Sequence, residues 1–213
     1  MFAALCSSPS VCHLELEVPK INYPEEMPRM KPSFFVLSRK LIAFTVLFAN
    51  TAFANVACPE AFNHDLKLLR SENTQNLCEL VEGKPVLIIN TASFCGYTGQ
   101  FSGLEKLHKQ YGGQGLVVLG FPSNDFKQEA KEESETAKIC YVNYGVSFTM
   151  FAPVSVKGAE ANSVFSYLSE QHGEPSWNFN KYLVDKNGSV VKRYNSSVKP
   201  NSKALQADIE SVL

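Results

Sequence analysis

Two short apolar runs with a helical pattern between them constrain the fold most strongly. Residues 86–90 form a β-branched apolar run, and residues 116–121 form a continuous apolar run typical of strands buried on both faces. Between them, large apolar side chains recur at helical spacing, namely Phe101, Leu104, Leu107 and Tyr111. The order strand, helix, strand predicts a βαβ unit with two parallel strands.

The remaining patterns extend this unit into a larger α/β fold. A β-hairpin is expected over 62–77, before the first apolar run. Downstream, the patterns predict a helix at about 132–144, a strand near 153–156, a helix at about 161–171, hairpin strands at 182–184 and 190–191, and a helix at 204–213. A βαβ unit followed by an antiparallel β-β-α end is the thioredoxin-type architecture. We therefore expect a central mixed sheet flanked by helices, with an N-terminal β-hairpin and an inserted helix and strand.

Composition excludes several functional classes. Of 213 residues, 45% are hydrophobic and 19% charged, which suits one globular domain with an extension. The formal net charge of -1 provides no electrostatic basis for binding nucleic acid or an anionic membrane surface. The four histidines are scattered without metal-ligand spacing, and the sequence has no glycine-rich phosphate loop. We expect neither a metal nor an organic cofactor.

The first 54 residues do not resemble part of a folded domain. Residues 1–29 hold four prolines and no periodic pattern, which predicts an unstructured leader before a true start at Met30. Residues 30–54 combine a basic flank, a short apolar run and small residues up to Ala54, as secretory signal peptides do. The mature domain would then be 55–213, secreted to the periplasm with no membrane span left after cleavage. An uncleaved anchor, a buried helix and a lipoprotein cut at the next cysteine are the alternatives.

Cysteine content agrees with export. The mature segment keeps four of the six cysteines, Cys58, Cys78, Cys95 and Cys140, and an even number permits two disulfides in an oxidising compartment. Cys58 and Cys78 flank the expected hairpin, so we predict a structural disulfide between them. Two reduced, buried thiols are the alternative. Cys95 and Cys140 are left as a pair available for chemistry.

Cys95 follows the first predicted strand and precedes the first core helix. Thiol chemistry needs a thiolate, and the amide donors at a helix N-terminus stabilise such an anion. The position therefore favours a reactive cysteine. A buried structural cysteine is the alternative.

Three segments resemble the signature blocks of the glutathione peroxidase family and occur in the family's order. They read Asn90-Thr91-Ala92-Ser93-Phe94-Cys95-Gly96-Tyr97-Thr98, Leu119-Gly120-Phe121-Pro122-Ser123-Asn124 and Trp177-Asn178-Phe179-Asn180-Lys181-Tyr182-Leu183-Val184-Asp185. The likeness extends from about residue 60 to the C-terminus. It implies a thiol peroxidase that reduces hydrogen peroxide and organic hydroperoxides, with lipid hydroperoxides among the candidates.

The resemblance implies four catalytic residues. Cys95 takes the place of the peroxidatic residue, and Gln128 matches the glutamine of the family's next loop. Trp177 and Asn178 complete the family's site. Amide and indole N–H groups are neutral donors that can stabilise a thiolate and polarise a peroxide oxygen. Taken singly, Trp177 would more often be a core anchor and Asn178 a turn residue.

The loop that carries Gln128 departs from the family pattern. It reads Asn124-Asp125-Phe126-Lys127-Gln128-Glu129-Ala130, one residue shorter than the family's loop and without its glycine and proline. We therefore expect it to reach the site along a different path. Asp125 stands where the family has glutamine, and a carboxylate near a thiol raises the thiol's pKa. We expect Asp125 to point away from Cys95.

Cys140 lies in a segment similar to the one that bears the resolving cysteine in the family's thioredoxin-dependent members. The resemblance implies that Cys140 condenses with a Cys95 sulfenic acid and that a thioredoxin-like dithiol protein reduces the disulfide. Because Cys140 is expected on a helix, that helix would have to unwind locally to meet disulfide geometry. A packed helix residue is the alternative for Cys140.

Glutathione is the alternative reductant. The connection 172–177 lacks the long inserted loop of the tetrameric members that use glutathione, which favours a monomer and weakens the case for glutathione.

Two other functions compete with a peroxidase. A dithiol oxidoreductase normally needs Cys-x-x-Cys, but Thr98 stands where the second cysteine would be. A non-enzymatic redox sensor would use the same Cys95–Cys140 switch, and only repeated turnover distinguishes the two.

Overall fold

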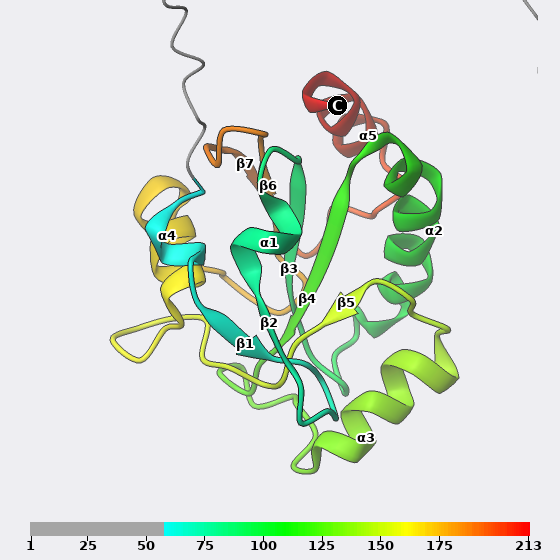
Figure 1. The fold of residues 1–213 in the computed structure, drawn as a ribbon. Coiled ribbons are helices and arrows are strands. Elements are labelled where there is room, and N and C mark those ends of the chain that lie inside the picture. Colours follow the sequence, from blue (N-terminus) through cyan, green and yellow to red (C-terminus); the bar gives the residue numbers. More distant parts are fainter. Residues whose placement is uncertain (1–57) are drawn as a thin grey trace, which may run out of the picture. The chain divides into compact units, whose positions relative to one another are not determined.

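The computed structural model describes residues 58–213 (Figure 1). Its strands are β1 (Asp65–Lys67), β2 (Thr74–Asn76), β3 (Val86–Thr91), β4 (Val117–Pro122), β5 (Thr149–Met150), β6 (Lys181–Val184) and β7 (Val190–Tyr194). The α-helices are α1 (Leu77–Val81), α2 (Phe101–Tyr111), α3 (Glu133–Ala137), α4 (Ser163–His172) and α5 (Lys203–Val212). Short 3-10 helices occupy η1 (Glu60–Phe62), η2 (Thr98–Gln100) and η3 (Gly112–Gln114), and η4 (Lys138–Asn143) is a π-helix.

The main sheet has five strands in the order β5-β4-β3-β6-β7. β3 pairs in parallel with β4, and β4 with β5, whereas β6 runs antiparallel to both β3 and β7. β1 and β2 form a separate antiparallel hairpin. The expected βαβ unit, the antiparallel β-β-α end and the N-terminal hairpin are confirmed, and so is the thioredoxin fold. An inserted helix and strand are also present, although the strand lies earlier than predicted.

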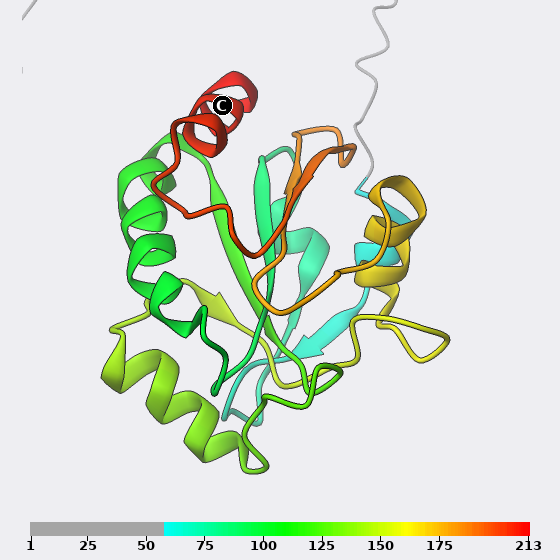
Figure 2. The ribbon, with the colours of Figure 1, turned by 180° about the vertical axis from the view of Figure 1, so that it is seen from behind.

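The sheet is buried on both faces. Successive side chains of a strand point to opposite faces, and the residues of β3 divide accordingly between two apolar clusters. Leu87 and Ile89 join the cluster formed with α2 and α5, and Val86 and Ile88 join the one formed with α4 and α1. Figures 1 and 2 show α2 and α5 on one side of the sheet and α4 on the other. Burial on both faces explains why the two central strands read as unbroken apolar runs.

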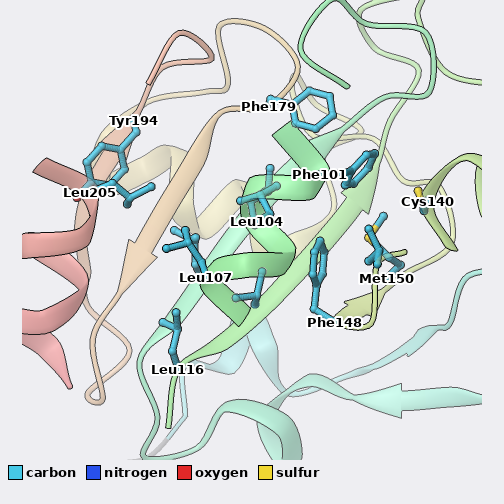
Figure 3. Close-up of a cluster of buried hydrophobic side chains, with 14 of the residues drawn as sticks. Phe101, Leu104, Leu107, Leu116, Cys140, Phe148, Met150, Phe179, Tyr194 and Leu205 are labelled. Carbon is cyan, nitrogen blue, oxygen red and sulfur yellow. The ribbon is translucent and has the colours of Figure 1, made fainter. Parts of the chain in front are cut away.

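The helix pattern of α2 is also explained by burial. Phe101, Leu104 and Leu107 face the first cluster, where Leu205 and Ile209 of α5 meet them (Figure 3). Each fully buried side chain of this size contributes about 1.5–3 kcal/mol relative to an exposed one. The spacing that predicted the helix is therefore the spacing that fills this layer of the core.

The predicted strand at 153–156 is wrong. The structure places β5 earlier, where Met150 pairs with Gly120 of β4. Gly120 permits this approach because a Cβ there would lie 2.2 Å from the Met150 sulfur. Pro153 has no N–H to donate to a ladder, so the bond from Phe151 N to the Gly120 carbonyl, at 3.0 Å, is followed by one from Val154 N to the Pro122 carbonyl, at 2.9 Å, without a continuous strand.

Two other boundaries differ from the predictions. The single helix expected at 132–144 is a short α3 followed by the π-helix η4, in which a wider turn replaces the α-helical ladder. The hairpin expected to reach residue 77 is shorter, because α1 begins there. The side chain of Asn76 caps α1 by accepting a hydrogen bond from Cys78 N at 3.0 Å.

The predicted leader (1–29) and signal peptide (30–54) lie outside the residues that the structure describes. Among residues 58–213, every helix lacks either the length or the apolar character that crossing a bilayer requires.

Candidate active site

Three loops meet at one edge of the main sheet, where β3 and β4 end and β6 begins. Asn90, near the end of β3 and fully buried, organises this edge through both of its polar groups. Its side-chain oxygen accepts from Asn180 N, and its side-chain nitrogen donates to the Trp177 carbonyl, both at 3.0 Å. Its own carbonyl accepts from Phe179 N at 2.6 Å. The loop before β6 is thereby held against the strand that leads into Cys95.

Cys95 lies in a tightly bonded turn between β3 and η2. Its backbone carbonyl accepts from both Thr98 N, at 3.0 Å, and the Thr98 hydroxyl, at 2.6 Å. Tyr97 N donates to the Cys95 sulfur at 3.5 Å. Thr98, which stands where a Cys-x-x-Cys motif would have its second thiol, therefore serves to fix the turn. The Cys95 thiol is free and 7% exposed, so a small peroxide has limited but direct access to it.

Gln128 and Asn178 come into direct contact. Asn178 Nδ2 donates to Gln128 Oε1 at 3.1 Å, although 50 residues separate them in sequence. Gln128 is also tied to the Cys95 turn, because its carbonyl accepts from Phe94 N at 2.9 Å. Within residues 58–213 the Gln128 side-chain nitrogen has no hydrogen-bond partner, and the buried Asn178 Oδ1 has none either. Both amides can therefore bind a further polar group at this place.

Trp177 lies on the surface of this region and is 40% exposed. Its ring packs against Phe126, with ring centres 5.2 Å apart, and Lys157 Nζ stands 4.7 Å from the centre of the Phe126 ring. Phe94 and Tyr97, on either side of Cys95, are exposed as well. The Cys95 turn is therefore flanked by exposed aromatic side chains on both sides.

In the loop between β4 and α3, two residues that differ from the family pattern, Asp125 and Lys127, have a defined conformation. The carboxylate of Asp125 accepts from Val156 N at 2.6 Å, from Lys157 N at 3.2 Å and from the Ser155 hydroxyl. Asp125 thus binds the segment after β5. Lys127, which stands where the family has glycine, has φ 60°, a left-handed conformation that costs a residue with a Cβ about 1 kcal/mol or more. Despite its shorter length, the loop delivers Gln128 to Asn178.

The second free thiol, Cys140, is buried in η4. It belongs to the same apolar cluster as Cys95, and Figure 3 shows it at the edge of that cluster near Met150. Burial raises the pKa of the Cys140 thiol to about 12, and the negative charge of Glu129 adds to the rise. Cys140 is therefore protonated as long as it stays in this position.

Cys58 and Cys78 are joined by a disulfide with Cα atoms 5.8 Å apart. It connects the segment before η1 to α1 and lies on the α4 side of the sheet. No group of three or more His, Cys, Asp or Glu side chains within residues 58–213 is arranged to hold a metal ion.

Sequence reasoning gave no role to two buried charged residues of this region. Glu129 accepts from Ser93, just before Cys95, and from Thr136 of α3, whereas the sequence motif points only to its neighbour Gln128. Lys181, fully buried at the start of β6, donates to the Val198 carbonyl at 2.8 Å and to Gln100 of η2. Burial lowers the pKa of Lys181 to about 7. A lysine that opens an otherwise apolar strand was the available signal.

A profile of the glutathione peroxidase family matches residues 62–169. A glutathione peroxidase of Lactococcus lactis is 42% identical over 138 residues, covering 62% of this chain and 87% of the relative. Glutathione peroxidase-like peroxiredoxin 2 of Saccharomyces cerevisiae is 41% identical over 157 residues, covering 70% and 96%. Hydroperoxy fatty acid reductase gpx1 of Synechocystis is 43% identical over 144 residues, covering 62% and 84%.

Solved structures agree with this assignment. The apo form of Trgpx superposes with a TM-score of 0.56 at 27% identity, covering 71% of this chain and 94% of that one. DsbF of Mycobacterium tuberculosis superposes with a TM-score of 0.54 at 13% identity, covering 74% and 100%, which shows a shared fold alone. Matched by the family profile over 108 residues and by relatives over most of their length, the chain belongs to the glutathione peroxidase family.

Proposed function

We propose that this peroxidase reduces hydroperoxides through Cys95 and resolves the product with Cys140. The observation that carries the proposal is that the turn with the free Cys95 thiol is bonded to the loop of the Gln128–Asn178 amide pair, because Phe94 N donates to the Gln128 carbonyl. Family membership supports a peroxidase, and the roles of the individual residues are the proposal.

In the first step the Cys95 thiolate attacks the distal oxygen of the hydroperoxide. The O–O bond breaks, the sulfur becomes a sulfenic acid, and the second oxygen leaves as an alcohol or water after taking a proton. The free N–H groups of Gln128 and the indole N–H of Trp177 are neutral donors for the negative charge that develops on the leaving oxygen. Neither competes with Cys95 as a nucleophile.

In the second step Cys140 attacks the Cys95 sulfenic acid, a disulfide forms and water leaves. Both free thiols lie in one cluster of buried side chains, which supports their pairing. Cys140 sits in a π-helix, a conformation often found at functional sites, and this supports local rearrangement there. A thioredoxin-like dithiol protein then reduces the disulfide. Glutathione and a sensor partner are the alternative acceptors of the oxidising equivalent.

Bulky apolar hydroperoxides are candidate substrates besides hydrogen peroxide. The exposed rings of Phe94, Tyr97 and Trp177 offer apolar contact beside the thiol. The Synechocystis relative is named for reducing hydroperoxy fatty acids, which supports the same class of substrate here.

We also propose that the protein acts as a periplasmic monomer after loss of residues 30–54. The Cys58–Cys78 disulfide supports an oxidising compartment. Mass determination of the protein recovered from a periplasmic extract tests the cleavage site, and its elution volume in size-exclusion chromatography tests the monomer.

The deciding experiment is intact mass of the reduced protein after one equivalent of hydrogen peroxide, with peptide mapping of the linkages. Rapid loss of two hydrogens mapped to Cys95 and Cys140 is the expected result. A stable sulfenic or sulfinic acid on Cys95 with Cys140 still reduced would indicate a one-cysteine enzyme that uses an external thiol. An unmodified Cys95 would overturn the proposed chemistry.

A further inference from the structure

The carboxylate of Glu129 connects the Cys95 turn to the helix that precedes Cys140. Glu129 Oε2 accepts from Ser93 N at 3.2 Å, and Glu129 Oε1 accepts from the Ser93 hydroxyl. The same Oε1 accepts from the Thr136 hydroxyl at 2.7 Å. Ser93 stands two residues before Cys95, and Thr136 stands four residues before Cys140. One side chain therefore binds both segments that carry a free thiol.

Glu129 depends on these bonds because it is buried. Glu129, Ser93 and Thr136 are 8%, 7% and 1% exposed. The remaining donor is Ala130 N at 2.8 Å, and no ion pair involves Glu129 among residues 58–213. A buried carboxylate without a cation is stable only while neutral donors satisfy it, so loss of one donor weakens the whole contact.

Thr136 and Cys140 are one helical turn apart and share a face of the helix. The hydroxyl of Thr136 therefore keeps the Cys140 face turned toward Glu129. There the charge of Glu129 adds to burial in raising the pKa of Cys140, which keeps the thiol protonated and unreactive. Cys140 cannot act as a nucleophile until it leaves this environment.

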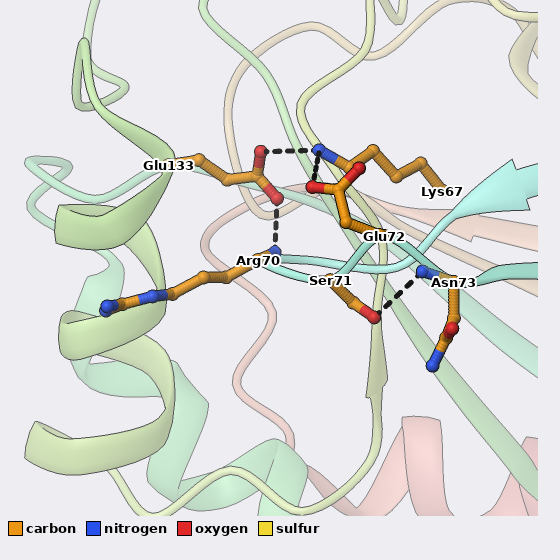
Figure 4. Close-up of polar contacts among 6 residues, drawn as sticks. All are labelled: Lys67, Arg70, Ser71, Glu72, Asn73 and Glu133. Carbon is orange, nitrogen blue, oxygen red and sulfur yellow. Dashed lines mark hydrogen bonds and ion pairs between the residues drawn. The ribbon is translucent and has the colours of Figure 1, made fainter.

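The start of α3 has a separate anchor. Glu133 accepts from Arg70 N and lies 3.4 Å from Lys67 Nζ, which ties the first residue of α3 to the N-terminal hairpin (Figure 4). Thr136 is thus the last anchored side chain before the π-helix η4. Unwinding that begins in η4 would reach the Thr136–Glu129 contact before it reaches Glu133.

We propose that Glu129 is a positioning residue that holds the Cys95 turn and the Cys140 helix together in the reduced protein. Breaking its bond to Thr136 limits the rate at which the Cys95–Cys140 disulfide forms. The inference rests on the proposed two-cysteine cycle. It adds that the lifetime of the sulfenic acid, and with it the chance of a second oxidation to sulfinic acid, is set by this contact.

The test compares Thr136→Val, which keeps the shape of the side chain but removes its hydroxyl, with Thr136→Ser, which keeps the hydroxyl. Tyr111→Phe is the matched control, since it removes a hydroxyl–carboxylate bond of 2.7 Å from Tyr111, the last residue of α2, to Glu210 of α5. After a pulse of hydrogen peroxide, samples are quenched with an alkylating agent, and the sulfenic, disulfide and sulfinic forms are counted by mass. Thr136→Ala replaces Thr136→Val if the latter does not fold.

We expect disulfide formation about tenfold faster in Thr136→Val, equivalent to about 1.4 kcal/mol, with less sulfinic acid at high peroxide. Thr136→Ser and Tyr111→Phe should match the wild-type protein. An unchanged or slower rate in Thr136→Val, or an equal acceleration in Tyr111→Phe, would overturn the inference. Absence of any Cys95–Cys140 disulfide in the wild-type protein would instead remove the proposed cycle itself.

Discussion

The segments that carry the two free thiols are held in different ways. The Cys95 turn is fixed by backbone and side-chain bonds from Thr98, Gln128 and Glu129, and it lies directly after a central strand. Cys140 lies in a π-helix at the edge of the core, and the helix before it contacts its surroundings through Glu133 and Thr136. Cys95 is 7% exposed, whereas Cys140 is 1% exposed and its burial keeps the thiol protonated.

This difference matches the two chemical tasks. Attack on a peroxide needs a sulfur and its donors in a fixed arrangement, because misplacement of about 1 Å is costly. Disulfide formation needs a thiol that can travel, since the two Cα atoms must come within about 7 Å. In the proposed cycle the Cys95 segment would stay fixed and the Cys140 segment would be released, and the following predictions test this difference.

The largest effect on activity is expected when Cys95 is replaced. Cys95→Ser should lower peroxidase activity by at least about 10⁴-fold, because a hydroxyl is a far weaker nucleophile than a thiolate. Peroxide consumption in a coupled thioredoxin assay measures this. Thermal unfolding of the variant should stay close to wild type, which excludes loss of fold as the cause. More than a trace of activity in a folded Cys95→Ser protein would contradict the mechanism.

Substitution of Cys140 should stop repeated turnover but leave the first step, the oxidation of Cys95, unchanged. In Cys140→Ser we expect one equivalent of peroxide to be reduced at the wild-type rate, after which the thioredoxin-dependent cycle stops and sulfinic acid accumulates on Cys95. Stopped reactions analysed by mass separate the two steps. Full multi-turnover activity with thioredoxin would remove Cys140 from the resolving role.

Alkylation should show that Cys140 is protected before oxidation. With its pKa raised to about 12 from 9.0, the thiolate fraction near pH 8 is about a thousandfold lower than that of an unperturbed thiol. In the Cys95→Ser background, iodoacetamide labelling of Cys140 should be slow and should rise about tenfold for each pH unit up to pH 10. Labelling as fast as in urea-unfolded protein would mean that the segment is already open.

The amide pair should matter for the first step alone. Gln128→Ala removes one neutral donor near the reacting oxygen, and loss of such a donor costs about 10²-fold. The rate of Cys95 oxidation should fall accordingly, while the rate of disulfide formation from the sulfenic acid should not change. Gln114→Ala, on the surface after α2, is the control with no expected effect. An equal slowing of both steps would show that Gln128 supports both segments.

The smallest expected effect is on the pH dependence of folding stability, through the buried side chain of Lys181. Lys181 has its pKa lowered to about 7, so the folded protein binds this proton less tightly than the unfolded chain does. Stability should therefore rise with pH between about 7 and 10.5, because over this range the unfolded chain still binds the proton that the folded protein has lost. We expect about 1–2 kcal/mol between pH 7 and pH 9 in urea unfolding, since the Val198 carbonyl partly offsets burial.

Lys181→Met should remove this part of the pH dependence, and Lys203→Met, at the exposed start of α5, should keep it. The same slope in Lys181→Met as in wild type would show that another group is responsible.

The sequence predicted the parts of the fold that burial on two faces determines. In β3 and α2 the spacing of apolar residues fits only one kind of secondary structure if all of these side chains are to be buried. β5 escaped prediction because two residues carry no period, and its position depends on the space above Gly120. The π-helix escaped too, since the pattern around Cys140 is equally compatible with an α-helix.

The proposed site residues could be named from motifs, but their contacts could not. The bond between Gln128 and Asn178 joins loops 50 residues apart, and nothing local in either loop specifies it. Glu129 shows the same limit more clearly, because its role follows from Ser93 and Thr136 meeting it in space. Motifs report residue types, whereas such contacts come from the packing of whole elements.

The packing of Trp177 on Phe126 has a practical consequence. Trp177 is the only tryptophan in the chain, and its ring rests on the loop that carries Gln128. Any shift of that loop during the cycle would change the surroundings of a single natural fluorophore. The emission of the unlabelled protein should therefore report each redox state in real time, so that stopped-flow traces can follow both steps without a dye.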